Sequence, residues 1–300
     1  MKLAQRIVLK YYRNKFNTLS VFSPRKAAEL AFKLFCTPYT RKRNYKAPPV
    51  FNKASKVSLQ FDNEEVNGFR WVPEKHYNGL KILICHGFDS YSYRFDNYVE
   101  ALINEGFEVL AFDAPAHGIS HGKTINIIQY RNMIIKINEA YGPIDGIMAH
   151  SFGGLAVALA IEKITNNPCK RLVLMAPATE TTHAINTFFK YLKLNSKVQS
   201  AFHQIIEEYG GNPASWYSVS RVMQNVQIPT LWVHDKEDSI TPYEDIHPLL
   251  NQSLPHIIFE ITTGLGHSLY RDDSITRRIV EYFAELKSPQ CTTAEIQHKP

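Results

Sequence analysis

Three residues of the types used in nucleophilic catalysis stand beside apolar stretches of the sequence. Ser151 lies between two apolar runs, and Asp238 and His267 each follow another. A serine hydroxyl is a weak nucleophile until a neighbouring base takes its proton, and a carboxylate can hold an imidazole in the tautomer that does so. In this chain order, the three residues predict a serine nucleophile with a histidine base and an aspartate partner.

Such residues can meet only if the elements before them end at one edge of a sheet. Apolar or alternating segments predict strands at residues 56–61, 66–72, 80–85, 108–113, 144–149, 171–176, 228–234 and 257–262. Amphipathic segments of helical length lie at residues 93–105, 125–141, 153–165 and 272–287. Continuous apolar strands alternating with helices predict an α/β fold, with a mainly parallel sheet covered on both faces. Open sheets of this kind place their sites beyond the carboxyl ends of the strands.

The same patterns divide the chain into three parts. Residues 1–50 are predicted to form a basic helical N-terminal extension, because a Ser-Pro helix start is followed by apolar residues at helical spacing. Residues 51–287 are predicted to form the main domain. Within it, residues 178–226 are too long for one crossover and are predicted to form a helical cap. The polar residues 288–300 are predicted to be a flexible tail.

The sequence around Ser151 resembles the α/β-hydrolase superfamily, and the resemblance covers about residues 56–287. The nucleophile elbow of that family reads Gly-x-Ser-x-Gly, and this chain has Ala149-His150-Ser151-Phe152-Gly153, with alanine in place of the first glycine. The segments AFDAPAHG and GLGH are also similar to those of poorly characterised bacterial hydrolases that carry an N-terminal extension. The resemblance implies an α/β-hydrolase fold with a helical cap and no cofactor or metal.

The resemblance also assigns roles to individual residues. It implies that Ser151 is the nucleophile, His267 the base and Asp238 the acid of a catalytic triad. It implies that the backbone N–H groups of Phe88 and Phe152 form the oxyanion hole, the pair of donors that binds the negatively charged oxygen of the intermediate.

Other residues offer competing interpretations of the site. Asp235 precedes Asp238 by three residues and is the alternative carboxylate. His117 and His121 have a metal-like spacing but lack a matching ligand cluster, so zinc binding is not expected. The paired glycines after Ser151 lack the lysine of a phosphate-binding loop. We expect His86, His117 and His150 to shape loops.

Charge and cysteine content indicate the surroundings of the protein. The 300-residue chain has a net charge of +6, yet residues 1–46 contain twelve Lys or Arg and a single acid, Glu29. This extension could touch an anionic membrane peripherally, or it could be a solvated helical face; nucleic acid is not an expected partner. Four scattered cysteines and no stretch typical of a signal peptide predict a cytoplasmic protein with free thiols. The sequence gives no oligomeric state.

The expected reaction is hydrolysis of a carboxylic ester or related acyl compound through an acyl-serine intermediate. Thioesterase, lysophospholipase-like, C–C bond hydrolase and perhydrolase chemistries remain open, because they can use the same triad. A non-catalytic binding protein on a hydrolase fold is the alternative of another class. A few of the aromatic residues of the cap are expected to line an acyl-binding cleft that favours longer acyl chains than acetate, with Phe188 and Phe189 as the candidates, while at least half of them are expected to pack the cap onto the core.

Overall fold

The computed structural model describes residues 3–39, 46–164, 167–252 and 254–288. Its centre is an eight-stranded sheet in the order β1-β2-β4-β3-β5-β6-β7-β8. The strands are β1 Ser55–Phe61, β2 Glu64–Trp71, β3 Lys81–Cys85, β4 Glu108–Phe112, β5 Gly146–His150, β6 Arg171–Met175, β7 Thr230–Asp235 and β8 Ile257–Thr262. The strand β2 pairs antiparallel with β1 on one side and with β4 on the other, and the remaining pairs are parallel. The predicted fold class is confirmed.

The central strands are buried on both faces, as their continuous apolar sequences predict. Alternate residues of β3 enter different cores: Leu83 and Cys85 join one hydrophobic cluster, and Ile82 and Ile84 join the other. This period of two follows from the pleat of a strand. The sheet therefore separates two cores, and its helices must supply apolar surface on both sides.

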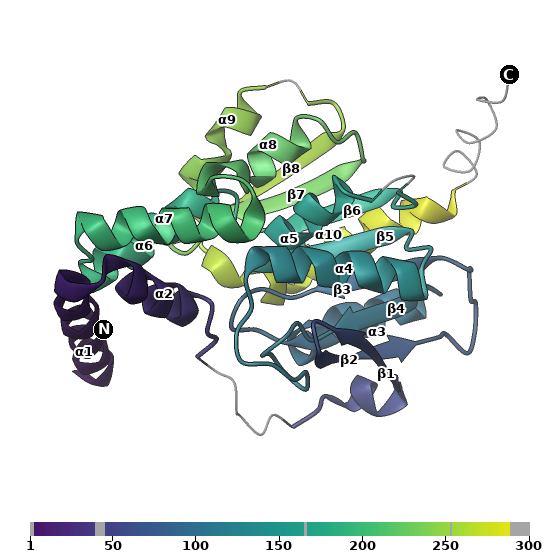
Figure 1. The fold of residues 1–300 in the computed structure, drawn as a ribbon. Helices are drawn as coiled ribbons and strands as arrows, with labels where there is room; N and C mark the ends of the chain where they lie inside the picture. Colours follow the sequence, from purple (N-terminus) through teal and green to yellow (C-terminus); the bar gives the residue numbers. More distant parts are fainter. Residues whose placement is uncertain (1–2, 40–45, 165–166, 253, 289–300) are drawn as a thin grey trace, which may run out of the picture.

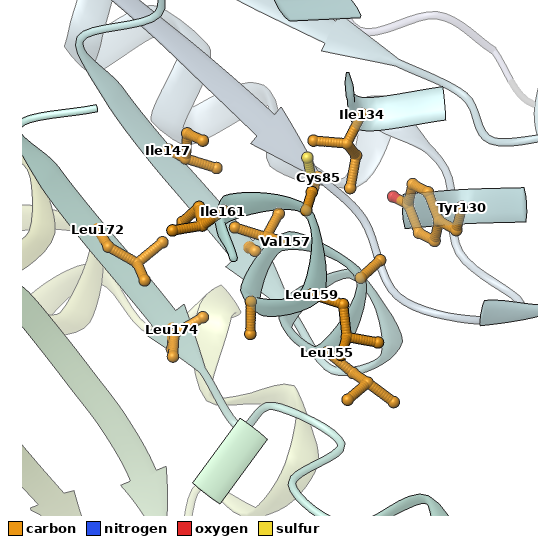
Figure 2. Close-up of a cluster of buried hydrophobic side chains, with 14 of the residues drawn as sticks. Cys85, Tyr130, Ile134, Ile147, Leu155, Val157, Leu159, Ile161, Leu172 and Leu174 are labelled. Atoms are coloured by element: carbon orange, nitrogen blue, oxygen red, sulfur yellow. The ribbon is translucent and has the colours of Figure 1, made fainter. Parts of the chain in front are cut away.

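Four long helices cover the sheet. They are α3 Asp96–Asn104, α4 Ile127–Tyr141, α5 Phe152–Ile161 and α10 Asp273–Ala284. Helices α4 and α5 contribute to one core, and α3 and α10 contribute to the other. The helix α5 is buried almost all round, and Figure 2 shows its Leu155, Val157 and Leu159 side chains among those of Cys85 and Leu174. This helix therefore starts inside the core, directly after Ser151.

The predicted cap region contains three helices that do not share one packing environment. They are α6 Thr181–Leu192, α7 Ser196–Gly210 and α8 Val219–Met223. Buried residues of α6 and α7 form a separate cluster, whereas Val219, Val222 and Met223 of α8 pack into the core beside α5. The last helix of the predicted cap region thus packs on the body of the molecule.

The N-terminal extension forms two helices, α1 Leu3–Phe22 and α2 Pro24–Phe35. Ser23 separates them and accepts a hydrogen bond from the Lys26 N–H at 3.2 Å, which caps α2. Both helices lie against α6 and α7 (Figure 1), and the cluster that joins them includes Phe16, Ala31 and Phe202. The extension therefore packs on the cap, not on the sheet.

Two predictions lie partly outside the described residues. The N-terminal extension expected at 1–50 includes residues 1–2 and 40–45, and the tail expected at 288–300 includes residues 289–300. A short helix α9, His247–Leu250, completes the α-helices of the described residues. None of the described helices combines the length and the apolar character needed to cross a membrane.

Candidate active site

Ser151 occupies a sharp turn between the end of β5 and the start of α5. Its backbone has φ 54° and ψ −122°, a positive φ that is uncommon for any residue except glycine. The turn is held on both sides, because the Ser151 N–H donates to the Met175 carbonyl at 3.0 Å and the Ala178 N–H donates to the Ser151 carbonyl at 2.9 Å. Strain of this kind persists only where the surroundings impose it, and it is common at active sites. The backbone around Ser151 therefore holds the serine on a strained turn.

The residues around Ser151 are small because neighbouring backbone crowds the turn. A methyl group on Gly153 would lie 2.5 Å from the His86 carbonyl oxygen, and one on Gly87 would lie 2.9 Å from the Ser151 Cβ. Ala149, where the family pattern has glycine, is fully buried in the core shared by β5 and α5. The alanine methyl group is therefore accommodated, and the departure from the pattern leaves the turn intact.

His267 lies between Ser151 and Asp238 at hydrogen-bond distances. Its Nε2 is 3.0 Å from the Ser151 Oγ, and its Nδ1 is 2.8 Å from the Asp238 Oδ2. With Nδ1–H donating to the carboxylate, Nε2 is free to accept the serine proton. The three residues that the sequence singled out thus meet at the carboxyl edge of the sheet.

The Asp238 carboxylate is enclosed by hydrogen-bond donors. Its Oδ1 accepts from the N–H groups of Ile240 at 2.8 Å and Thr241 at 3.0 Å, and its Oδ2 accepts from the Thr241 hydroxyl at 2.8 Å. Burial by itself would raise the pKa of Asp238, but the contact with His267 and these donors outweigh burial and lower the pKa to about 2. The carboxylate therefore stays charged beside the imidazole.

Asp235, the competing carboxylate, lies elsewhere and makes different contacts. It accepts hydrogen bonds from the Thr262 hydroxyl at 2.7 Å and from the N–H groups of Leu265 at 3.0 Å and Glu237 at 2.9 Å. These contacts join the end of β7 to the loop that precedes His267. Asp235 thus holds the loop in place, while Asp238 touches the imidazole.

The backbone N–H groups of Phe88 and Phe152 have no protein hydrogen-bond acceptor among the described residues. Phe152 is the first residue of α5, whose N-terminal end carries a partial positive charge. The two rings meet edge to face, with their centroids 5.6 Å apart, and both are partly exposed. These positions fit donors to an oxyanion above Ser151, and the rings provide apolar surface beside it.

Two buried histidines shape the loop that carries Phe88. The His86 Nδ1–H donates to the Gly87 carbonyl at 2.8 Å, and its Nε2 accepts from the Ala114 N–H at 2.9 Å. The His117 Nε2 accepts from the Asp89 N–H at 3.0 Å. Burial lowers the pKa of each imidazole to about 4, so both are neutral at pH 7. The structural role predicted for both residues agrees with these contacts.

His150 lies behind the catalytic imidazole. Its Nε2–H donates to the His267 backbone carbonyl at 3.0 Å, and its ring lies between those of His267 and Tyr270. Burial and the neighbouring His267 lower the pKa of His150 to about 3. His150 is therefore a neutral hydrogen-bond donor that holds the backbone of His267 in place.

Thr241 is the site residue that the sequence reasoning missed. Besides its bonds to Asp238, the hydroxyl oxygen of Thr241 lies 3.2 Å from the His267 Nδ1. The His234 Nε2–H donates to the Thr241 carbonyl at 2.8 Å and so fixes this residue against β7. The short distance of Thr241 from Asp238 in the sequence could suggest the contact of the Thr241 N–H with the carboxylate, but not the contacts of the hydroxyl.

The metal-like pair His117 and His121 is not assembled into a binding site. Both ring nitrogens of His117 serve loop contacts, and the His121 side chain is exposed and 4.0 Å from Glu65. The described residues contain no group of three or more His, Cys, Asp or Glu side chains that could hold a metal ion.

The structure packs the cap aromatics Phe188 and Phe189 against rings of α2 and α7. Phe188 packs on Phe35 of α2, with ring centroids 5.2 Å apart, and Phe189 packs edge to face on Phe202 of α7 at 5.1 Å. Both rings belong to the cluster between the cap and the N-terminal helices. The sequence showed that these rings would be buried but not which surface they would cover.

A family model and a curated relative are similar to this chain in sequence. A family model described as serine aminopeptidase, S33, matches residues 79–218. A Mycoplasma genitalium protein provisionally named esterase/lipase 2 is 23% identical over 256 residues, which cover 73% of this chain and 92% of the relative.

Solved esterase structures share the fold. The Pyrococcus furiosus esterase PF2001 aligns with a TM-score of 0.61 at 18% identity, over 84% of this chain and 97% of that one. Est1E of Butyrivibrio proteoclasticus, solved with ferulic acid, aligns with a TM-score of 0.59 at 20% identity, over 76% and 98% of the two chains. This chain therefore shares its fold with these esterases, and over residues 79–218 it is similar to the serine aminopeptidase family.

Proposed function

We propose that the protein is a serine hydrolase that cleaves a carboxylic ester or related acyl compound through an acyl-serine intermediate. The observation that carries the proposal is the chain of contacts from Asp238 through His267 to the Ser151 hydroxyl. The similarity to esterases supports the same class of reaction.

The first half of the reaction forms the acyl-enzyme. The Ser151 Oγ attacks the ester carbonyl carbon while the His267 Nε2 takes the hydroxyl proton, and Asp238 stabilises the resulting imidazolium. The negative charge on the former carbonyl oxygen is bound by the N–H groups of Phe88 and Phe152. When the intermediate collapses, the C–O bond breaks, and the alcohol leaves with the proton from His267.

The second half regenerates the enzyme. A water molecule gives a proton to the His267 Nε2 and attacks the acyl carbon, and the same two N–H groups bind the second oxyanion. Collapse releases the carboxylic acid and returns the proton to the Ser151 Oγ. The residues named here supply every proton transfer, so the scheme needs no cofactor.

Covalent labelling with a fluorophosphonate tests the assignment. We expect one phosphonyl group per chain, located on Ser151 by peptide mass spectrometry, and no labelling of Ser151→Ala. Ser200, an exposed serine on α7, offers a matched control, because Ser200→Ala should label as the parent does. If the folded parent protein is not labelled at neutral pH, Ser151 is not an activated nucleophile and the non-catalytic alternative stands.

A further inference from the structure

The helix α1 has two faces, and one of them is anchored to the cap. Phe16 is buried in the cluster formed with α6 and α7. Polar contacts add to this packing: the Asn17 Nδ2 donates to the Lys193 carbonyl at 3.1 Å, and the Asn195 Nδ2 donates to the Ser20 Oγ at 2.7 Å. The helix is thus held in a fixed orientation, and its opposite face is directed away from the cap.

The opposite face of α1 carries large apolar side chains in contact with solvent. The exposed fractions are 61% for Ile7, 58% for Tyr11, 78% for Val21 and 83% for Phe22. Ile7, Tyr11 and Phe22 follow one another at spacings of 4 and 11 residues, and Val21 follows Ile7 by 14 residues, so all four lie on one side of the helix. Isolated exposed apolar residues are ordinary, but a row of them on one helix needs a covering surface.

Positive charge flanks this row, with no acidic residue on the helix. The helix contains Arg6, Lys10, Arg13 and Lys15 and no Asp or Glu. The neighbouring segment 181–206 of the cap adds Lys190, Lys193 and Lys197, again without an acid. Lys10 and Lys15 are exposed on either side of the apolar row, where long lysine stems can lie along a bilayer with the ammonium groups at its surface.

We propose that the exposed face of α1 docks on the surface of an anionic lipid bilayer. An amphipathic helix with apolar residues on one side and lysines at its margins lies in the interface of such a membrane. A second copy of the chain fits less well, since it would bring two positively charged faces together. A nucleic acid would pair with the lysines but would leave Val21 and Phe22 exposed to water.

Docking in this way would bring the cap close to the membrane. Figure 1 shows α1 and α2 at the end of the molecule where α6 and α7 lie, away from β1 and β2. The proposal does not depend on catalysis by Ser151, because binding can be measured without substrate.

Vesicle co-sedimentation of the full chain tests the proposal. The probes are vesicles of phosphatidylcholine and phosphatidylglycerol in equal parts, and vesicles of phosphatidylcholine alone. We expect the protein to sediment with the anionic vesicles, to remain in solution with the neutral ones, and to be released by high salt. The variants Phe22→Ser and Lys10→Glu/Lys15→Glu should each weaken partitioning roughly tenfold or more.

Matched control variants distinguish binding by the exposed face of α1 from a general effect of changing surface residues. Val72→Ser and Lys56→Glu change an exposed apolar and an exposed basic residue outside α1 and α2, and they should bind as the parent does. All variants should keep the circular dichroism spectrum of the parent, because the altered side chains lie on the surface.

Three results would overturn the proposal. The first is no sedimentation with anionic vesicles, or equal sedimentation with neutral ones. The second is self-association in the absence of vesicles that Phe22→Ser abolishes, which would identify a second copy as the occupant. The third is salt-sensitive binding to duplex DNA that Lys10→Glu/Lys15→Glu abolishes and Phe22→Ser leaves unchanged.

Discussion

The carboxyl edge of the sheet and the cap are held together by different interactions. At the edge, Asp238 and Asp235 each accept several directed hydrogen bonds, and the positions of the loops follow from them. In the cap, α6 and α7 meet α1 and α2 mainly through aromatic and aliphatic side chains. Directed bonds fix a geometry to within tenths of an ångström, whereas apolar packing fixes burial and leaves the choice of partner open.

Removing the nucleophile at the carboxyl edge of the sheet should cause the largest loss of activity. Ser151→Ala should lower kcat on a p-nitrophenyl ester by about 10⁴-fold or more, because no other group can form the acyl-enzyme. Its melting temperature should not fall, because the substitution removes only the Oγ of Ser151 and leaves the packing around it unchanged. A residual rate near that of the parent would mean that the chemistry lies elsewhere.

Substitutions of the two aspartates should affect different properties, kcat at Asp238 and stability at Asp235. Asp238→Asn should lower kcat by about 10⁴-fold while the fold is retained, because the amide no longer enforces the productive tautomer of His267. Asp235→Asn should mainly reduce stability, by about 1–3 kcal/mol, because an amide group replaces an oxygen that accepts backbone hydrogen bonds. Paired measurements of kcat and of unfolding in urea check both expectations; the opposite ranking of the two kcat values would assign the acid to Asp235.

Acid should destabilise the site region through its buried histidines. His86 and His117 have pKa values near 4 and His150 near 3, all below the 6.5 of an unfolded chain. Between the folded and unfolded pKa values, the unfolded state binds more protons than the folded state. The contribution to the free energy of unfolding is therefore fully present above pH 6.5 and falls as the pH drops toward the folded pKa values. Each histidine should contribute a slope of about 1.4 kcal/mol per pH unit within its window.

Urea unfolding of the parent and one variant measures this slope. His86→Gln should reduce the dependence of the unfolding free energy on pH between 6 and 4, by about 1.4 kcal/mol per pH unit. The exposed His121 is the matched control, and His121→Gln should leave the slope unchanged. Equal slopes in the parent and His86→Gln would show that His86 is not buried as a neutral group.

The smallest expected effect concerns the choice of acyl chain. Phe189 is buried and Phe188 is half-buried in the cluster shared with the N-terminal helices, whereas the partly exposed rings of Phe88 and Phe152 provide apolar surface beside Ser151. Activity should rise from p-nitrophenyl acetate to butyrate, by up to about fourfold per methylene group that is fully buried. Phe152→Ala should flatten this profile, whereas Phe189→Ala should leave the profile and reduce stability by about 3–5 kcal/mol. A flattened profile in Phe189→Ala alone would place the acyl site in the cap.

The contrast between the two regions also explains what the sequence could predict. The strands were located to within a few residues, because the central ones are buried apolar runs and the outer ones still carry apolar residues between polar turns. The site residues could be proposed because each stands just past a strand, where parallel topology brings loops together. The partners of α1 and α2 could not be predicted, because an apolar stripe shows that a face is buried but not against what. Thr241 was missed because its role depends on a hydroxyl position that only the folded loop defines.

Trapping the acyl-enzyme tests the central claim most directly. The parent protein is mixed with excess p-nitrophenyl butyrate, quenched in acid within the first turnovers, and analysed by intact-mass and peptide mass spectrometry. The proposed mechanism predicts a butyryl adduct on the peptide that contains Ser151, formed together with a burst of p-nitrophenol and absent from Ser151→Ala. Steady turnover by the parent without a burst, together with an adduct on another residue, would contradict Ser151 as the nucleophile.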